Sequence, residues 1–408
     1  MISYKEAQVI IREAANARKI DTETVALKDI AGRVCAQDIT TPLDVQPFDN
    51  SAMDGFAVLV SDLAEASIST PVTLKSTGIT GAGSNIPDQP ITSGTCIQIM
   101  TGAPIPPKAD AVIPVELATV NNKEIVFTSC PETRDNIRFA GEDFKKGTSL
   151  IKAGKAFDAS HILPLATLGI EKIQVYKKPE AAFLSTGTEL VDDLTAPLKY
   201  GQIYNSNHPY AVAMLRAMGA NVLSLPTIKD DIEIFKKQLV SVMDHNKDIV
   251  ISSGAVSAGN FDFVKSGLEA IGAEILYHKV RLKPGKPNLL ARLPNGTLYF
   301  GLPGNPVATA VGLRFFAGTA LQIMSGMKAE QPIQAKIMTK FTKKPGMTMY
   351  LKGKMESWED GSLTVDMLDG QASFMVSPFL DMNVWISIPE DKDTYKPGDV
   401  VDVFPIVP

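Results

Sequence analysis

The chain has 408 residues, a formal net charge of −5 at pH 7 and a hydrophobic content of 45%. This length predicts roughly two to four domains with packed cores, and the acidic balance, with no run of five basic residues, argues against nucleic acid as a partner. The three cysteines, Cys35, Cys96 and Cys130, are far apart and form no CxxC pair, so the sequence suggests neither a zinc site nor a disulfide framework.

The N-terminus lacks the basic start and the apolar core of a signal peptide. The most apolar stretch, near residues 301–324, carries two prolines and Arg314, which makes it a poor membrane span. We therefore expect a soluble cytoplasmic protein with no membrane partner.

The first third of the chain predicts one helix and then a region of strands. Ser3 and Glu6 fit a capping box that opens a helix to about residue 18. Pro42 and Pro47 hold the next stretch extended, so the segment at 47–55, PFDNSAMDG, is expected as a loop before a strand. Its polar residues are also explained by a loop that caps its own backbone. Residues 56–141 alternate strand-like runs with Gly and Pro turns and predict a small β-rich domain.

The rest of the chain predicts an α/β domain and then further strands. A helix is expected over 158–170 and a linker near 177–179. Short apolar runs then alternate with helical patterns from residue 181 to about 324, which is typical of βαβ units in a doubly wound parallel sheet. After Gly326, short strands with turn signals predict a small terminal β-barrel or sandwich.

Two loops of the α/β region are expected at the same edge of the sheet. One apolar run ends in Ser252-Ser253-Gly254 and another in Pro303-Gly304-Asn305-Pro306. In such sheets ligands bind outside the carboxyl ends of the strands. Asn305 can cap the next helix with Pro306 at its first position, and a helix start attracts anions.

Basic residues lie between these two loops in the sequence. If the segment at 278–287 is extended, Lys279, Arg281 and Lys283 share one face, because strand side chains alternate. An anionic ligand beside that face would be favourable, and we favour a phosphate or oxyanion site. A solvated, charged edge strand is the alternative.

Three acidic residues, Glu189, Asp230 and Asp262, lie just beyond predicted strands, on the side of the sheet where a ligand is expected. Beside the basic segment they suggest a phosphate site bridged by Mg²⁺, which prefers oxygen ligands together with substrate phosphates. Asp230 and Asp262 are also explained as helix N-caps.

Several catalytic motifs are absent from the sequence. The glycines at 254 and 259 are spaced as in a P-loop, but Asn260-Phe261 replaces the required Lys-Ser/Thr pair. Ser257 lies in GxxSxG and not in the GxSxG of a hydrolase elbow. The four histidines are scattered and form no HExxH.

Seven motifs occur in the order seen in one enzyme family. The chain resembles the molybdopterin molybdenumtransferases, the MoeA family to which the E domain of gephyrin belongs, over nearly its whole length. The motifs lie at 47–55, 100–104, 141–143, 185–190, 201–204, 283–287 and 301–306.

The resemblance implies a fold and an activity. It implies insertion of molybdate into adenylylated molybdopterin, with Mg²⁺ as cofactor and release of AMP. The implied α/β multidomain fold has a helical segment split between 1–41 and 142–176 and an inserted β-rich lobe at 42–141. A doubly wound molybdopterin-binding α/β domain at 177–326 and a C-terminal β-barrel at 327–408 follow. The resemblance further implies a homodimer, with the active cleft between the α/β domain of one subunit and the lobe of the other, and a molybdopterin adenylyltransferase as upstream partner.

The resemblance also assigns residues to roles, which we combine with those from the loops. The expected catalytic residues are Asp54, Asp143, Lys279 and Lys283. The expected substrate-binding residues are Ser252, Ser253, Gly254, Ser257, Lys286, Pro303, Gly304, Asn305, Pro306 and Ser373. The expected metal ligands are Glu189, Asp230 and Asp262. In this hypothesis the lysines hold anions, N–H groups of the two loops stabilise developing charge, and Asp54 and Asp143 position metal or water from the opposing subunit.

The sequence departs from the common family pattern at a few positions. Ala255 stands where a second glycine is usual, and residues 347–352 lack an arginine often found there. A preference for tungstate over molybdate is therefore open. The alternative functions are a molybdopterin adenylyltransferase, which shares the α/β domain, and a non-enzymatic scaffold of the gephyrin type.

Overall fold

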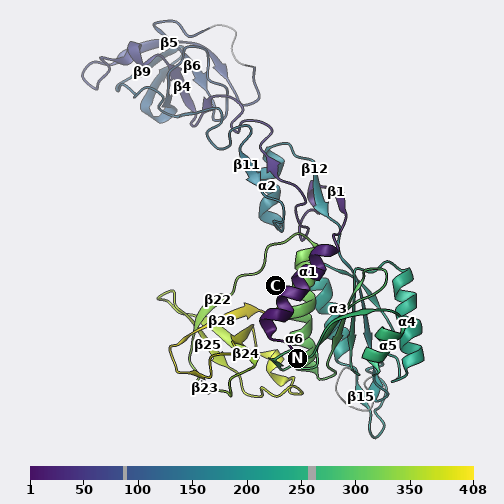
Figure 1. Ribbon diagram of the computed structural model, residues 1–408. Coiled ribbons are helices and arrows are strands. Elements are labelled where there is room, and N and C mark those ends of the chain that lie inside the picture. The colour runs from purple at the N-terminus through teal and green to yellow at the C-terminus, as the bar shows by residue number, and fades with distance from the viewer. Residues whose placement is uncertain (86–89, 256–262) are drawn as a thin grey trace. The chain divides into compact units, whose positions relative to one another are not determined.

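The computed structural model describes residues 1–85, 90–255 and 263–408, which divide into two compact units. The first, here called the main unit, contains residues 1–37, 153–159 and 172–408. The second, the lobe unit, contains residues 38–152 and 160–171. Figure 1 shows the elements that each unit contains.

The main unit is built on a sheet of six strands in the order β16-β13-β17-β21-β20-β18. The first four strands run parallel, β20 is antiparallel to β21, and β18 is antiparallel to β20 and so runs in the same direction as the first four. All residues of β17 and β21 are buried, as expected for strands covered on both faces. The bounds are β13 Glu180–Ser185, β16 Asn221–Ser224, β17 Ile249–Ser253, β18 Glu274–His278, β20 Leu289–Arg292 and β21 Leu298–Leu302.

Helices cover both faces of this sheet, which confirms the doubly wound prediction (Figure 1). On one face lie α1 (Tyr4–Ala17), α3 (Asn207–Ala217) and a continuous helix made of α6 (Pro306–Gly312), a π-helical turn (Leu313–Ala317) and α7 (Gly318–Met324). On the other lie α4 (Ile232–Asp244) and α5 (Val264–Ala270). The helix at 306–324 is long and apolar enough to cross a membrane, but 83% of that window is buried inside the protein, as in a core helix.

The C-terminal strands close into a barrel, which decides between the barrel and the sandwich expected from the sequence. The order is β24-β25-β22-β28-β26, and β26 pairs back onto β24. The bounds are β22 Ile333–Ile337, β24 Thr348–Ser357, β25 Leu363–Met367, β26 Val384–Ile388 and β28 Val400–Pro405. The short β19 (Leu282–Lys283) pairs in parallel with β24, so the basic segment joins the barrel to the α/β sheet.

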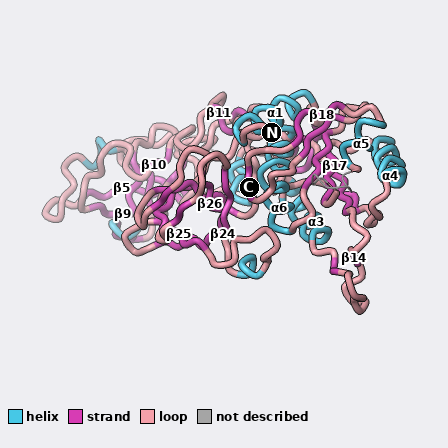
Figure 2. Tube along the Cα trace, turned by 60° about the horizontal axis from the view of Figure 1, so that its bottom comes forward, coloured by secondary structure: helices cyan, strands magenta, loops and turns pink. Residues whose placement is uncertain are grey.

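Short strand pairs complete the main unit. The pair β14 (Leu190–Val191) and β15 (Ile203–Tyr204) lies in an arm that extends from the sheet (Figure 2). The other pairs are β1 (Thr22–Ala26) with β12 (Lys172–Tyr176) and β23 (Phe341–Thr342) with β27 (Thr394–Tyr395).

The lobe unit contains a sheet of six strands in the order β7-β4-β6-β5-β9-β8. Its bounds are β4 Gly55–Val58, β5 Val72–Thr80, β6 Thr95–Ile99, β7 Ala111–Pro114, β8 Ala118–Asn121 and β9 Glu124–Phe127. The unit also contains β2 (Ile39–Thr40) with β11 (Ser149–Ile151), β3 (Asn50–Ser51) with β10 (Ile137–Arg138), and α2 (Ile162–Thr167).

The split segment at 1–41 and 142–176 is less helical than predicted. Its α-helices are α1 and α2, while β1 and β12 pair over five residues each. Alternation of β-branched with polar residues in TETVA and KIQVY explains this pairing.

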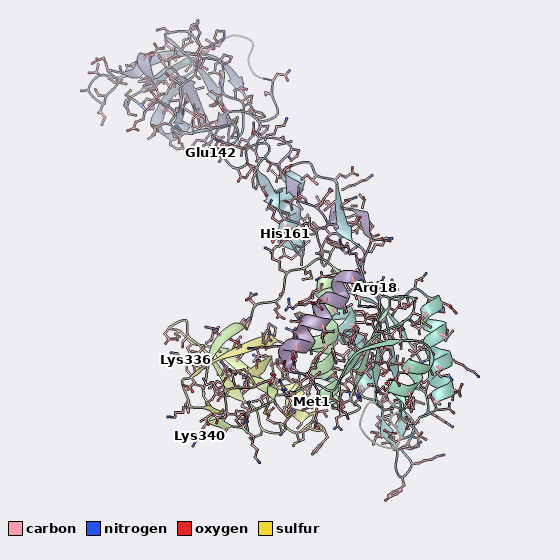
Figure 3. The ribbon with its side chains drawn as sticks, viewed as in Figure 1. Met1, Arg18, Glu142, His161, Lys336 and Lys340 are labelled. Carbon is pink, nitrogen blue, oxygen red and sulfur yellow. The ribbon has the colours of Figure 1, made fainter. Side chains whose placement is uncertain are left out.

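Helix α1 has the predicted capping box, in which Ser3 and Glu6 bond to each other's backbone N–H groups. It packs into the core of the main unit through Ala7, Ile11 and Ala14. Arg18, at its C-terminal end (Figure 3), forms a 3.2 Å ion pair with Asp248.

Candidate active site

A cavity of about 950 Å³ lies in the main unit at the carboxyl ends of three parallel strands. The loops after β13, β17 and β21 line it, as do the basic segment at 282–287 and two pieces of the barrel, 347–351 and 371–374. The structure therefore brings together the two loops and the basic segment that the sequence singles out.

The basic segment does not form one extended face. Lys279 has a left-handed φ of +72°, which interrupts the strand alternation. Arg281 turns to Glu390, with Nε 3.0 Å from the carboxylate. Lys283 and Lys286 line the cavity, whereas Lys279 is not among the described residues that do. The row of three aligned cations is therefore wrong, and two lysines of the segment reach the site.

A tight backbone turn brings Lys286 back to the same cavity as Lys283. The Lys279 N–H donates to the Asn288 carbonyl at 2.9 Å, and the Val280 N–H donates to the Lys286 carbonyl at 2.9 Å. These bonds close the chain between the end of β18 and the start of β20, so Lys283 and Lys286 both line the cavity.

The two serines at the end of β17 face opposite sides. Ser253 lines the cavity, and its Oγ lies 3.3 Å from Ser185 Oγ. Ser252 is fully buried and hydrogen-bonds to the Tyr299 hydroxyl in the core. Because strand side chains alternate, only one of the pair can face the ligand.

Gly254 makes the turn that follows these serines. Its φ is +102°, and a Cβ there would lie 2.3 Å from the Thr186 carbonyl oxygen. Its N–H donates to the Leu302 carbonyl at 3.1 Å, so this N–H is not available to stabilise charge on a ligand, contrary to the prediction. Ala255 has a left-handed φ of +51°, which explains why glycine suits that position. Ser257 and Asp262 lie outside the described residues.

The loop at 303–306 leads into α6 as predicted, but the Asn305 side chain does not cap the helix. Pro306 is the first helical residue and Asn305 occupies the N-cap position without a side-chain cap bond. The Asn305 amide instead donates to Ser373 Oγ at 3.1 Å, and the Val307 N–H donates to the Ser373 carbonyl at 3.1 Å. This ties the barrel serine to the loop of the α/β domain, with both in the cavity wall together with Pro303 and Gly304.

Two of the predicted metal ligands, Glu189 and Asp230, line the cavity. Desolvation raises the pKa of Asp230, and the nearby Glu189 carboxylate raises it further. The cap of α4 is Asp231, which accepts from the Glu233 and Ile234 N–H groups, so Asp230 is not used as a cap.

The two cavity carboxylates fit a divalent cation. Two neighbouring carboxylates repel each other, and a cation bound between them offsets that repulsion. Mg²⁺ commonly takes only one or two carboxylates and completes its shell with water and substrate phosphates. Among the described residues, no cluster of three or more His, Cys, Asp or Glu side chains suited to a metal is found.

Asp54 and Asp143 belong to the lobe unit. The Asp54 carboxylate accepts from the Thr101 N–H at 2.6 Å and from Thr101 Oγ1 at 2.7 Å. These bonds, the backbone one first, lower the pKa of Asp54. Two of the recognised motifs, 47–55 and 100–104, thus meet at one exposed carboxylate. Asp143 is also exposed and lies in a turn, where its N–H donates to the Val45 carbonyl at 2.8 Å.

Sequence reasoning missed polar residues that shape the cavity wall. Asn205 is almost fully buried and donates to Asp192 at 2.9 Å and to Thr227 at 2.8 Å. Asn207 donates to the Gly304 carbonyl at 2.7 Å and so holds the loop before α6. The signal for both was a pair of asparagines directly after a short strand, next to the 201–204 motif.

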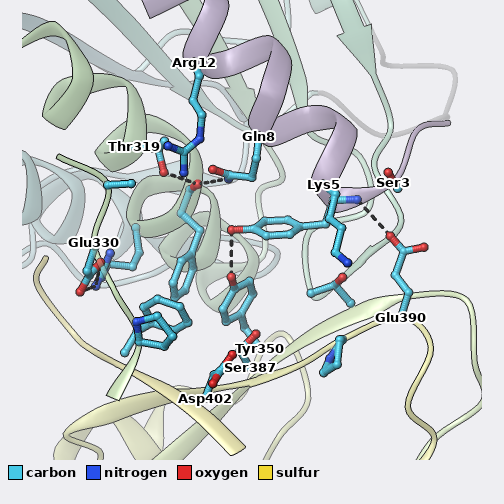
Figure 4. A pocket seen from close by; sticks show the side chains of 18 of the residues that line it. Ser3, Lys5, Gln8, Arg12, Thr319, Glu330, Tyr350, Ser387, Glu390 and Asp402 are labelled. Carbon is cyan, nitrogen blue, oxygen red and sulfur yellow. Dashed lines mark hydrogen bonds and ion pairs between the residues drawn. The ribbon is translucent and has the colours of Figure 1, made fainter. Parts of the chain in front are cut away.

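A second cavity, of about 550 Å³, lies between α1, the helix at 306–324 and the barrel (Figure 4). Several of its polar groups bond to one another. The Tyr350 hydroxyl donates to the Tyr4 hydroxyl at 2.9 Å, and the Phe315 carbonyl accepts from Gln8 at 2.7 Å and from Thr319 at 3.0 Å (Figure 4). The first cavity, with two lysines and two carboxylates at strand ends, is therefore the better candidate.

Comparisons with known proteins cover nearly the whole chain. Residues 2–169 match the MoeA N-terminal region (domain I and II), residues 182–322 a probable molybdopterin binding domain, and residues 334–406 the MoeA C-terminal region (domain IV). A molybdopterin molybdenumtransferase of Haemophilus influenzae is 34% identical over 94% of each chain. That of Bacillus subtilis is 34% identical over 94% of this chain and 89% of its own. The crystal structure of the molybdopterin biosynthesis moeA protein from Pyrococcus horikoshii OT3 matches with a TM-score of 0.84, 28% identity and 99% coverage of both chains.

Proposed function

Because this chain belongs to the MoeA family of molybdopterin molybdenumtransferases, we propose that it inserts molybdate into molybdopterin in the cavity of the main unit. The enzyme is a transferase of molybdenum cofactor biosynthesis. The observation that carries the assignment to this cavity is its donor set, in which Lys283 and Lys286 face a wall with Ser253 and Ser373.

The two lysines suit the charge of the reactants. Molybdate and the phosphate of molybdopterin are both anions, and bringing them together in water is opposed by their repulsion. A lysine ammonium acts as a point charge that binds phosphate, so two ammonium groups in one cavity offset that repulsion and concentrate the anions there.

We further propose that the molybdopterin arrives adenylylated and that AMP is released. Glu189 and Asp230 would hold Mg²⁺, and Asp262 is a third expected ligand outside the described residues. When bound, Mg²⁺ supplies a positive charge that neutralises the pyrophosphate and polarises its phosphorus–oxygen bonds. The chain's own part is to place the two anions side by side: Lys283 and Lys286 bind them, and Ser253 and Ser373 offer hydroxyl groups that orient their oxygens.

A homodimer is part of the proposal. Asp54 and Asp143 are exposed carboxylates of the lobe unit, and the described residues that line the cavity all belong to the main unit. We propose that these aspartates act on the substrate from the partner subunit. A cytoplasmic location and delivery of substrate by a molybdopterin adenylyltransferase remain predictions.

The test is one incubation of the purified protein with adenylylated molybdopterin, Mg²⁺ and molybdate, scored for AMP and for molybdenum cofactor. We expect both products from the native chain and at least a tenfold loss of kcat/KM in Lys283→Ala, because one charge-assisted contact contributes about 1.5–3 kcal/mol. Lys279→Ala is the matched control from the same segment. Because Lys279 is not among the described residues that line the cavity, this variant should keep most of the activity. ATP consumption with plain molybdopterin, and no cofactor formed, would contradict the proposal.

A further inference from the structure

A lysine of the barrel is fully buried next to the cavity. Lys352 lies on β24 and has 0% of its surface exposed. Its Nζ donates to the carbonyl oxygens of Gly370 at 2.6 Å, Met375 at 2.9 Å and Ala372 at 3.4 Å. An ammonium group has three donors, so this side chain uses its full capacity on one segment, residues 370–375, here called the 370–375 loop.

A buried ammonium is retained only where oxygen atoms replace its water. Removing such a group from water without partners costs several kcal/mol, and desolvation lowers the pKa of Lys352 here. The three carbonyls offset that cost, and in return the loop is held at three points. The Gln371 side chain adds two bonds to the backbone of Lys352, at 3.0 and 2.9 Å.

The 370–375 loop forms one end of the cavity. Gln371, Ala372 and Ser373 line the cavity, and Ser373 is tied to the loop before α6 through Asn305 and Val307. Because Ser373 Oγ accepts from the Asn305 amide, its own hydroxyl hydrogen remains to be donated to a ligand.

The carbonyl contacts also orient the N–H groups of the loop. In a planar trans peptide the C=O and the following N–H point in opposite directions. Since the carbonyls of Gly370 and Ala372 face Lys352, the N–H groups of Gln371 and Ser373 face away from it. Neither N–H has a hydrogen-bond partner among the residues that the structure describes. Both belong to residues of the cavity wall.

We propose that Lys352 is a positioning residue for oxyanion binding: its ammonium group sets the 370–375 loop so that the Ser373 hydroxyl and the neighbouring N–H groups are presented to molybdate. This inference rests on the proposed function. Lys352 does not touch the ligand, and its effect passes through the loop. It is the one cation in residues 347–352, which places a positive charge behind the donors without exposing a side chain to the substrate.

The test compares oxyanion binding by calorimetry, with molybdate and tungstate, in the full-length native chain and in Lys352→Met, Lys352→Arg and Ser373→Ala. We expect Lys352→Met to weaken binding roughly tenfold or more, because several hydrogen-bond donors to the anion lose their orientation together. Lys352→Arg should restore most of the affinity. Lys354→Met is the matched control, since Lys354 lies on the same strand with an exposed side chain paired to Glu356, and it should bind as the native chain does.

Two further readouts separate positioning from a structural role. If Lys352 acts through Ser373, the double variant Lys352→Met with Ser373→Ala should bind molybdate with the same affinity as whichever single variant has the lower affinity. If the two residues act independently, their losses of binding free energy should add. In turnover, Lys352→Met should raise the KM for molybdate and leave the KM for the pterin substrate unchanged. Native binding by Lys352→Met, or additive losses, would overturn the inference.

A folding defect does not remove the test. If Lys352→Met does not fold, Gln371→Met removes the second tie between the loop and Lys352 and is expected to weaken oxyanion binding in the same direction; native binding by that variant would overturn the inference. Binding is measured without turnover, so a native chain that binds molybdate through Ser373 but forms no cofactor contradicts the proposed function alone.

Discussion

Ser252 and Ser253 carry the same side chain in adjacent positions, yet their surroundings differ. One hydroxyl bonds to Tyr299 inside the core, and the other faces the cavity near Ser185. A similar division separates Asp230 from Asp231, of which one lines the cavity and the other caps α4. At the residue scale, therefore, the direction of the side chain decides whether a polar group faces the cavity or forms a hydrogen bond within the fold.

The raised pKa of Asp230 predicts a pH dependence of cation binding. A carboxyl group whose pKa is raised above its ordinary value of 3.8 binds a proton at higher pH than usual, and that proton competes with a metal ion. We expect Mg²⁺ affinity to fall as the pH drops through this raised pKa and to level off above it. The measurement is a series of Mg²⁺ titrations between roughly pH 4 and pH 7, a range that begins near the ordinary pKa of a carboxyl group and extends above it.

The raised pKa of Asp230 also affects the stability of the metal-free protein, and it can be changed by substitution of its neighbour. The folded protein disfavours the ionised form of Asp230, so this group opposes folding more as the pH rises from the unfolded pKa through the raised one. Glu189→Gln removes the like charge and should lower the pKa of Asp230, as followed by carboxyl NMR. Asp231→Asn is the control, because asparagine also caps helices. An unchanged Asp230 titration in Glu189→Gln would show that the two carboxyls do not interact.

At the scale of elements, the turn after β17 depends on a single glycine. Gly254 joins the buried strand to the cavity wall with a φ of +102° and leaves no room for a Cβ beside Thr186. The loops after β13 and β17 therefore approach each other too closely to admit a side chain at this position.

We expect Gly254→Ala to distort this turn. The left-handed conformation alone costs roughly 1–2 kcal/mol for a residue with a Cβ, and the contact with the Thr186 carbonyl forces the two loops apart. The variant should unfold at lower temperature and show a raised KM for the pterin substrate. Gly78→Ala is the matched control, because an added Cβ there meets nothing within 4 Å. An unaltered melting temperature and KM in Gly254→Ala would contradict this account.

At the scale of the whole molecule, the proposed homodimer predicts complementation between two inactive variants. Asp54→Asn removes a carboxylate of the lobe unit and Glu189→Gln removes a carboxylate of the cavity wall, and each homodimer should be inactive. If each site combines the lobe of one subunit with the cavity of the other, mixed dimers contain one intact site. Random mixing of the subunits should then restore about a quarter of the native activity.

The readout is AMP release after the two variants are unfolded, mixed and refolded together, with each refolded alone as control. No recovery in a mixture shown to contain mixed dimers would mean that Asp54 and Glu189 act within one chain or do not share a site. Gel filtration with light scattering measures whether the chain is dimeric at the concentrations used.

The order of elements and the family could be determined from the sequence alone. Alternation and apolar runs predicted the doubly wound sheet, the β-rich lobe and the terminal strands, because these patterns repeat every two to four residues. Loops after strands of a parallel sheet meet at one edge, which predicts that Gly254, Gly304 and Asn305 lie close together, and all three line the cavity.

Tertiary structure decided which polar atoms reach the cavity. Lys279 leaves the expected face through a left-handed φ, Asn305 bonds to Ser373 across 68 positions of sequence, and Lys352 closes a loop about twenty residues away in the chain. No local pattern encodes such contacts, because each depends on how strands and loops from separate elements pack. Local periodicity determines which elements form, whereas the partners of a side chain are determined by what the folded chain brings next to it.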